Sequence, residues 1–272
     1  MTQCQSGGAL LQPSVHFIAI TTPYCIMSRI LVLLYGVVSY VMFLVVFLWA
    51  IAFVGNIDFY VGHTIDSAGS DSFMTALLWN ALWLGIFAIS HSVMARPGFK
   101  AAWTKIIPES IERSTYVLVT NITLILIFTQ WHPMNDVIWS TSGMVATILN
   151  GLFWFGWLLV LLSTFMINHF DLFGLRQVWL RFKETDYSNL SFTTAFAYRF
   201  VRHPLLLGFI IAFWAAPEMS MGHLIFAIAT TVYMLIAIQL EEKDMEDVFG
   251  DKYRKYKSEV PMLVPTGKSA SD

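Results

Sequence analysis

The sequence predicts an all-α integral membrane protein with about six transmembrane helices. The last two are expected to form a short helical hairpin, followed by an amphipathic helix at the membrane surface. Hydrophobic residues make up 57% of the 272 residues and charged residues only 12%, which is far from the balance of a water-soluble globular domain. The charged residues are also confined to short segments between long, nearly uncharged runs.

Four of these runs have the length of one membrane-spanning helix, which needs roughly 20 apolar residues. They cover residues 30–54, 73–95, 114–131 and 143–167. A further run, residues 205–240, is too long for one helix and contains Ala216-Pro217-Glu218. Because proline removes a backbone donor and glutamate is costly in lipid, we predict two shorter spans joined by a tight turn there.

The distribution of charge supports six spans. All sixteen Lys and Arg residues then fall in segments on one side of the membrane. The loops on the other side carry only acidic charge, at Asp58, Asp66, Asp71 and Asp136. By the positive-inside rule, both termini are expected in the cytoplasm.

The domain organisation is expected to be simple. Residues 27–265 form one membrane-embedded domain, preceded by an extension over residues 1–26 and followed by a tail over residues 266–272, both expected to be disordered. Met27-Ser28-Arg29 directly precedes the first apolar run, so Met27 is a candidate start of translation. The extension lacks an early basic region and is therefore a poor signal peptide.

Several classes of function are disfavoured by composition. Cys4 and Cys25 are the only cysteines, so we expect no disulfide framework, iron-sulfur cluster or metal cage. A net charge of -2 and the lack of a basic stripe with interleaved aromatic residues give no reason to expect a nucleic-acid partner. The sequence gives no indication of the oligomeric state.

Polar residues gather where four of the predicted spans end on the basic side. These are Ser90-His91-Ser92, the segment 168–171 with His169 and Asp171, Tyr198-Arg199, Arg202-His203-Pro204, and Glu241-Glu242. Each residue alone is explained equally well by ordinary polar helix ends, where basic side chains reach toward the headgroups. The grouping of histidines, carboxylates and arginines on one side indicates a site there.

Folding the run 205–240 back on itself would bring Arg202 and His203 beside Glu241 and Glu242. A guanidinium, an imidazole and two carboxylates can hold a small zwitterionic or cationic cofactor. Pro204 fits the first turn of a helix, whose free amide groups favour an anionic group.

Two features of this region leave alternatives open. Gly208 removes a side chain, which would admit either a flat ligand or a neighbouring helix. The amphipathic segment after Glu242 is expected to lie on the membrane surface, and it could also cap the proposed pocket.

The C-terminal half resembles the membrane-embedded methyltransferases, which include isoprenylcysteine carboxyl methyltransferases and phospholipid methyltransferases. The motifs in order are Arg202-His203-Pro204, Gly208, Glu241-Glu242 and Tyr253-x-x-Tyr256. Those enzymes use S-adenosylmethionine without a Rossmann domain, and this chain likewise contains no G-x-G-x-x-G. The superfamily usually has tyrosine two positions after the proline, where this chain has Leu206, so the hydrogen bond of that hydroxyl is missing here.

Within this superfamily, the segments 35–56, 90–97, 112–117 and 163–177 resemble the bacterial methanethiol S-methyltransferase family. That resemblance implies methylation of methanethiol by S-adenosylmethionine, giving dimethyl sulfide and S-adenosylhomocysteine, in the inner membrane of a bacterium. The expected partners are a small thiol and the lipid bilayer. Alternatives are methylation of another thiol or of a lipid amine, or a non-enzymatic transporter or accessory protein of the same fold.

The resemblance also implies roles for individual residues. The cofactor would contact Arg202, His203, Gly208, Glu241 and Glu242, together with Pro204, Tyr198 and Arg199 of the same region. Because a thiolate is a far better nucleophile than a thiol, a base nearby would help the reaction. The candidate catalytic residues are His169 and His91 as bases, with Asp171 orienting one of them, and no metal is expected.

Overall fold

The computed structural model describes residues 23–58, 62–69, 71–188, 192 and 194–265. Within them, five helices are long and apolar enough to cross a membrane. They are α1 (Pro23–Val54), α3 (Phe73–Ala95), α5 (Glu109–Gln130), α6 (Gly143–Ile167) and α10 (Met221–Phe249). Another apolar helix, α9 (Pro204–Trp214), has only 11 residues. The all-α membrane fold predicted from the sequence is confirmed.

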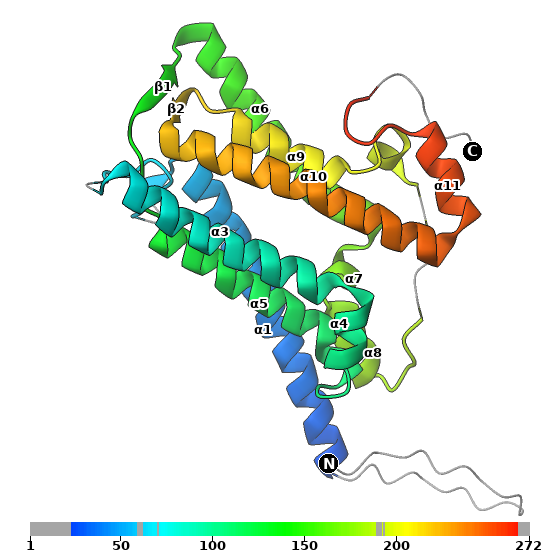
Figure 1. Cartoon of the computed structure of the whole chain (residues 1–272). Helices are drawn as coiled ribbons and strands as arrows, with labels where there is room; N and C mark the ends of the chain where they lie inside the picture. The colour runs from blue at the N-terminus through cyan, green and yellow to red at the C-terminus, as the bar shows by residue number, and fades with distance from the viewer. Residues whose placement is uncertain (1–22, 59–61, 70, 189–191, 193, 266–272) are drawn as a thin grey trace, which may run out of the picture.

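The long helices form two groups that lie side by side (Figure 1). In one group α5 packs against α1 and α3, and α8 (Leu175–Phe182) packs against α1 and α5. In the other, α9 packs against α6 and α10. Short helices follow three of the long ones: α4 (Pro97–Trp103) after α3, α7 (His169–Leu172) after α6, and α11 (Asp251–Glu259) after α10. The 3-10 helix η1 (Phe196–Arg199) precedes α9.

The buried core lies where the two groups meet. Phe53 of α1, Trp131 after α5 and Phe226 of α10 contact one another edge to face, with ring centroids 6.1, 6.4 and 5.7 Å apart. Phe213 of α9 adds an edge contact with Phe226 at 5.0 Å. Aromatic pairs in such geometry contribute about 0.5–1.5 kcal/mol each beyond burial. Because lipid tails are as apolar as these side chains, close packing holds the two groups together.

Two short strands join the groups at the end of the molecule away from α11 (Figure 1). β1 (Val137–Ser140) pairs antiparallel with β2 (Glu218–Ser220). β2 follows Pro217 in the segment between α9 and α10, so the predicted turn at this proline is present. The strand pair is absent from the sequence prediction. We call this the strand end and the opposite end, which carries Arg202 and Lys257, the basic end.

A partly buried carboxylate fixes the strand end. Asp66 accepts hydrogen bonds from the Ser220 hydroxyl and, at 2.6 Å, from the Asn56 amide, and its Oδ2 lies 3.4 Å from Nδ1 of His223. Burial alone would raise the pKa of Asp66, but the hydrogen bonds from His223, Ser220 and Asn56 lower it on balance. The charged carboxylate therefore links the loop after α1 to the start of α10.

The last two membrane segments differ in length, which corrects the prediction of two short spans. Helix α9 is about 16 Å long at 1.5 Å per residue, roughly half of a bilayer core of about 30 Å. Helix α10 has 29 residues and runs past Glu242 to Phe249, where a separate surface helix is predicted. Residues 243–249 contain no proline or glycine, so nothing ends the helix until Gly250, which has a φ of 55°.

The amphipathic segment after Gly250 folds back on the chain. Tyr253 and Tyr256 of α11 are 3% and 6% exposed and pack against Phe192. The Tyr256 hydroxyl donates a hydrogen bond of 2.6 Å to the carbonyl of Tyr198. The aromatic face of α11 therefore covers the segment that leads into α9, as the capping alternative requires.

The predicted domain limits fall partly outside the described residues. Helix α1 begins at Pro23, so residues 23–26 belong to the first helix and not to a separate extension. Residues 1–22 and 266–272, for which the sequence predicts disorder, lie outside the part of the chain that the structure describes.

Helices α6 and α9 approach so closely at Gly156 that a larger side chain there should force them apart. A β carbon at Gly156 would lie 2.6 Å from the Gly208 carbonyl oxygen and 2.7 Å from the Ala212 nitrogen. We expect Gly156→Leu to lower the free energy of unfolding by about 1–3 kcal/mol, the usual cost of overpacking. The matched control is Gly151→Leu on the same helix, where a β carbon would meet nothing within 4 Å. Thermal unfolding in detergent micelles measures both variants, and equal melting temperatures would contradict the prediction.

Candidate active site

The centre of the candidate site is Glu242, whose side chain is 2% exposed. Its Oε1 accepts a hydrogen bond of 2.7 Å from Nε of Arg202 and lies 3.1 Å from Nε2 of His203. Its Oε2 lies 3.0 Å from Nζ of Lys257. The structure thus brings the basic triplet beside the acidic pair, as folding the apolar run back on itself predicts.

Backbone hydrogen bonds hold the segment before α9 in place beside the residues that follow α11. The amide of Arg202 donates to the carbonyl of Pro261 at 2.9 Å, and the amide of His203 donates to the carbonyl of Met262 at 3.2 Å. Nη1 of Arg202 also donates to the carbonyl of Lys257 at 3.0 Å. The Arg202 guanidinium, just before α9, therefore connects Glu242 of α10 with the last turn of α11.

Lys257 is a site residue that the sequence prediction lacks. Its Nζ lies 2.8 Å from Glu246 and 3.0 Å from Glu242. Hydrogen bonds to the Glu246 and Glu242 carboxylates raise the pKa of Lys257, so the ammonium stays charged at neutral pH. In the sequence it is one of several lysines on the polar face of an amphipathic helix, and its spacing does not distinguish it from the others.

The two adjacent glutamates point in different directions, because consecutive helical residues differ by roughly 100° around the axis. Glu242 faces α9 and α11 and is saturated by cations of the protein. The Glu241 side chain is 56% exposed, and its Oε2 lies 3.8 Å from Nδ1 of His203. Of the pair, only Glu241 presents a carboxylate that a ligand could reach.

The other predicted cofactor residues surround this centre in different ways. Pro204 occupies the first turn of α9, as predicted, and Arg199 ends η1. A β carbon at Gly208 would lie 2.7 Å from the carbonyl oxygen of Gly156, so α6 occupies the space beside this glycine, as the helix-packing alternative has it. Burial raises the pKa of Tyr198, so its phenol stays protonated.

His91 is held between α3 and α5. The Tyr116 hydroxyl lies 2.8 Å from its Nε2, and Oγ1 of Thr120 lies 3.0 Å from its Nδ1. The Thr120 hydroxyl donates its own proton to the Tyr116 carbonyl at 2.9 Å, so it accepts from the ring. The proton of the neutral ring therefore sits on Nδ1, and Nε2 accepts from Tyr116. The Phe87 ring stacks on the imidazole with centroids 5.2 Å apart.

His169 has the same kind of environment between α1 and α6. The Tyr40 hydroxyl lies 2.8 Å from its Nε2, and Oγ1 of Thr164 lies 2.7 Å from its Nδ1. The Thr164 hydroxyl donates to the carbonyl of Leu161 at 2.7 Å, which again assigns the ring proton to Nδ1. The ring is 3% exposed and stacks on Phe165 with centroids 4.1 Å apart. Burial lowers the pKa of His169, so the ring is neutral at pH 7.

Asp171 does not orient either histidine, which corrects that expectation. Its Oδ1 accepts a hydrogen bond of 3.0 Å from Arg176, and its Oδ2 accepts one of 3.3 Å from the Tyr187 hydroxyl. The side chain of Asn168 accepts from the Asp171 amide at 3.1 Å, and Gly174, at a φ of 85°, then reverses the chain into α8. This turn directs the carboxylate to the start of α8 and away from the histidine rings.

The predicted candidates thus form one cluster around Glu242 and two histidine sites. Within the described residues, neither His91 nor His169 hydrogen-bonds to Arg202, His203 or the glutamate pair. In that same part of the chain, no group of three or more His, Cys, Asp or Glu side chains is placed to hold a metal ion.

The helices and the buried ion cluster define a multi-pass membrane protein with a polar site at one end of its spans. Comparison with known sequences shows that the chain belongs to the NnrU protein family, whose match covers residues 78–255. No solved structure matches this chain.

Relatives of this chain include methanethiol S-methyltransferases of three bacteria. The protein of Crocosphaera subtropica is 51% identical over 88% of this chain and 93% of its own length. Methanethiol S-methyltransferase 2 of Bradyrhizobium diazoefficiens is 50% identical over 88% and 91% of the two chains. The protein of Mycobacterium tuberculosis is 51% identical over 88% and 98%. The resemblance predicted from the sequence is confirmed.

Removing the charge of Glu242 should destabilise the basic end. Glu242→Gln leaves Arg202 and His203, whose side chains are 9% and 8% exposed, without their carboxylate. We expect a loss of about 3–5 kcal/mol in unfolding free energy, the usual cost of breaking a buried ion pair. Thermal unfolding measures it, with Glu109→Gln at an exposed position of α5 as the control. Indistinguishable melting temperatures of the two variants would show that the cluster does not hold the fold.

His169 should make the stability fall in mild acid. Because its pKa in the folded protein is lower than the value of about 6.5 in the unfolded chain, protonation favours unfolding. Its contribution is fully present above about pH 6.5 and is lost as the pH falls through the folded pKa. We expect the melting temperature of the wild type to drop more than that of His169→Gln between about pH 7.5 and about pH 5. Parallel curves would contradict this.

Proposed function

We propose that this chain transfers the methyl group of S-adenosylmethionine to methanethiol, giving dimethyl sulfide and S-adenosylhomocysteine. The observation that carries the proposal is the identity of about half of all residues, over 88% of the chain, to proteins named methanethiol S-methyltransferase. The cluster around Glu242 supports it, because it offers a preformed polar site at the end of otherwise apolar helices.

The membrane orientation follows from the same proposal. We place the chain in the inner membrane of a bacterium with both termini in the cytoplasm. The acidic residues Asp58, Asp66, Asp71 and Asp136 fall in the loops at the strand end, while Arg202 and Lys257 lie at the opposite end. The positive-inside rule then directs the basic end, and the cofactor site with it, to the cytoplasm.

The residues at the basic end fit the groups of the proposed cofactor. Glu241 has an accessible carboxylate for the amino group, while the first turn of α9 after Pro204 presents free amides toward a carboxylate. Arg202, His203 and Lys257 attract the ligand's carboxylate only weakly, because Glu242 already pairs with all three side chains. Glu242 thus holds the basic side chains of the site in place, and Glu241 binds the amino group of the cofactor.

The chemistry asks little of the protein beyond alignment. The thiol sulfur forms a bond to the methyl carbon supplied by the cofactor as the carbon–sulfonium bond breaks, its electron pair stays on S-adenosylhomocysteine, and the thiol proton is released. Holding the two sulfur atoms in line is a proximity effect worth several kcal/mol. His91 and His169 stay predictions as proton acceptors. His91 could accept a proton on Nε2 in two ways. The Tyr116 hydroxyl could turn away from Nε2, or it could donate its own proton to Nε2 while it accepts the proton of the thiol.

The two glutamates allow a test that separates binding from folding. We expect Glu241→Gln to weaken binding of labelled S-adenosylmethionine by about 1.5–3 kcal/mol, the value of a hydrogen bond to a charged group, which corresponds to roughly 10- to 100-fold. Its melting temperature should stay close to that of the wild type, because the side chain is exposed. Dimethyl sulfide in the headspace of cells fed methanethiol should fall accordingly.

The control for this test is Glu109→Gln, which should leave binding and product unchanged. Ethanethiol and phosphatidylethanolamine as alternative acceptors test the other substrate classes. A wild-type protein that binds S-adenosylmethionine but makes no dimethyl sulfide would overturn the choice of methanethiol. A wild type that does not bind it would overturn the methyltransferase proposal.

A further inference from the structure

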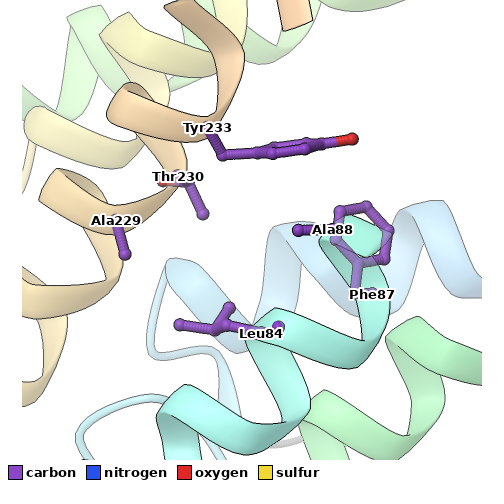
Figure 2. Close-up of a pocket in the computed structure, with 7 residues that line it drawn as sticks. Leu84, Phe87, Ala88, Ala229, Thr230 and Tyr233 are labelled. Carbon is purple, nitrogen blue, oxygen red and sulfur yellow. The ribbon is translucent and has the colours of Figure 1, made fainter. Parts of the chain in front are cut away.

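A cavity of about 200 Å³ lies between α3 and α10. Figure 2 shows Phe87 and Ala88 of α3 facing Ala229, Thr230 and Tyr233 of α10 across it. The Thr230 hydroxyl donates to the carbonyl of Phe226 in its own helix at 2.7 Å, so its proton is not available to a ligand. The hydroxyls of Thr230 and Tyr233 are the polar side-chain groups of an otherwise apolar lining.

The cavity exists because the side chains around it are small. Gly85, Ala88 and Ala229 leave room where larger residues would close the gap between the two helices. A β carbon at Gly85 would meet no heavy atom within 4 Å. Pockets for drug-sized ligands measure roughly 300–1,000 Å³, so this cavity suits a smaller molecule.

Two contacts between the end of α3 and α10 lie on the side of the cavity toward the basic end. The Tyr233 hydroxyl lies 3.1 Å from Oγ of Ser92, and Arg96 forms an ion pair of 2.7 Å with Asp244. The first of these bonds leaves one polar contact at the boundary of an otherwise apolar space. The Phe87 ring, which lines the cavity, also stacks on the imidazole of His91.

Helix geometry relates this cavity to the proposed cofactor site. At roughly 100° per residue, Tyr233 and Asp244 lie on one face of α10, and Glu242 lies on the opposite face. Glu241 lies on the flank between these faces, about 12 Å along the axis from Tyr233. A ligand that extends about 12 Å from Glu241 toward Tyr233 would therefore reach the cavity along this flank of α10.

We propose that this cavity binds the thiol substrate, with Tyr233 and Ser92 at its boundary toward the cofactor. The inference rests on the proposed function and specifies where its acceptor sits. The occupant is a small neutral thiol and not a lipid chain, because a space of about 200 Å³ is small for a lipid chain and lies on the face of α10 that adjoins the flank of Glu241. An apolar wall favours the thiol because its methyl group leaves water on binding.

The test fills the cavity without touching the ion cluster. Gly85→Leu should raise KM for methanethiol by roughly 10- to 200-fold, the discrimination that one added hydrophobic group achieves, and raise it more for ethanethiol. Binding of S-adenosylmethionine should be unchanged. Ala229→Gly, which enlarges the cavity, should shift kcat/KM toward ethanethiol. The matched control is Gly151→Leu, an open position on α6 that lines no part of the cavity.

The outcomes separate this inference from the proposed function. An active wild type with the same KM for both thiols in Gly85→Leu and Gly151→Leu, at equal melting temperatures, would overturn the thiol site and leave the methyltransferase in place. That result would also be expected if a lipid chain occupied the cavity. A wild type that yields no dimethyl sulfide would overturn both. If Gly85→Leu unfolds, the change of thiol preference in Ala229→Gly decides, and an unaltered preference would overturn the site.

Discussion

The basic end of the structure depends on one buried carboxylate that three segments share. Glu242 of α10 receives Arg202 and His203 from the start of α9 and Lys257 from α11. Burying an ion costs several kcal/mol, and only well-placed counter-charges and hydrogen bonds offset that cost. Because the partners come from separate parts of the chain, satisfying the carboxylate requires α9, α10 and α11 to be in place together.

Helix α10 distributes its chemistry around its circumference. One face carries Tyr233 and Asp244 toward α3, and the opposite face carries Glu242 toward α9 and α11. Glu241, between them, remains open. Helix α10 therefore both holds the neighbouring segments in place and lines the two proposed sites, the cofactor site and the thiol cavity.

How far sequence reasoning reaches can be judged from particular residues. The contact of Arg202 with Glu242 was predictable, because both end one apolar run that has to fold back in a membrane. The membrane spans were predictable for the same reason, apart from the unequal lengths of α9 and α10. Lys257 was not predictable, since it joins the cluster only because Gly250 turns α11 back.

Other differences between the structure and the sequence prediction have local causes that a hydrophobic pattern in the sequence does not show. Asp171 pairs with Arg176 because of the turn at Gly174. The strand pair β1–β2 is too short to produce an alternating pattern. The two histidines stand at helix ends where polar residues are common, and only the structure shows that each is bracketed by a tyrosine and a threonine.

The shortness of α9 bears on how two reactants of unequal polarity would meet. Helix α9 has 11 residues, about half of what a bilayer core needs, so it covers only part of the bilayer depth. Under the proposed function, a nucleoside-based donor reaches the basic end from water, whereas a small volatile thiol also dissolves among the acyl chains. The two reactants would then reach the protein from different solvents. Its turnover in cells would follow the amount of thiol in the lipid phase more closely than the amount in the cytosol.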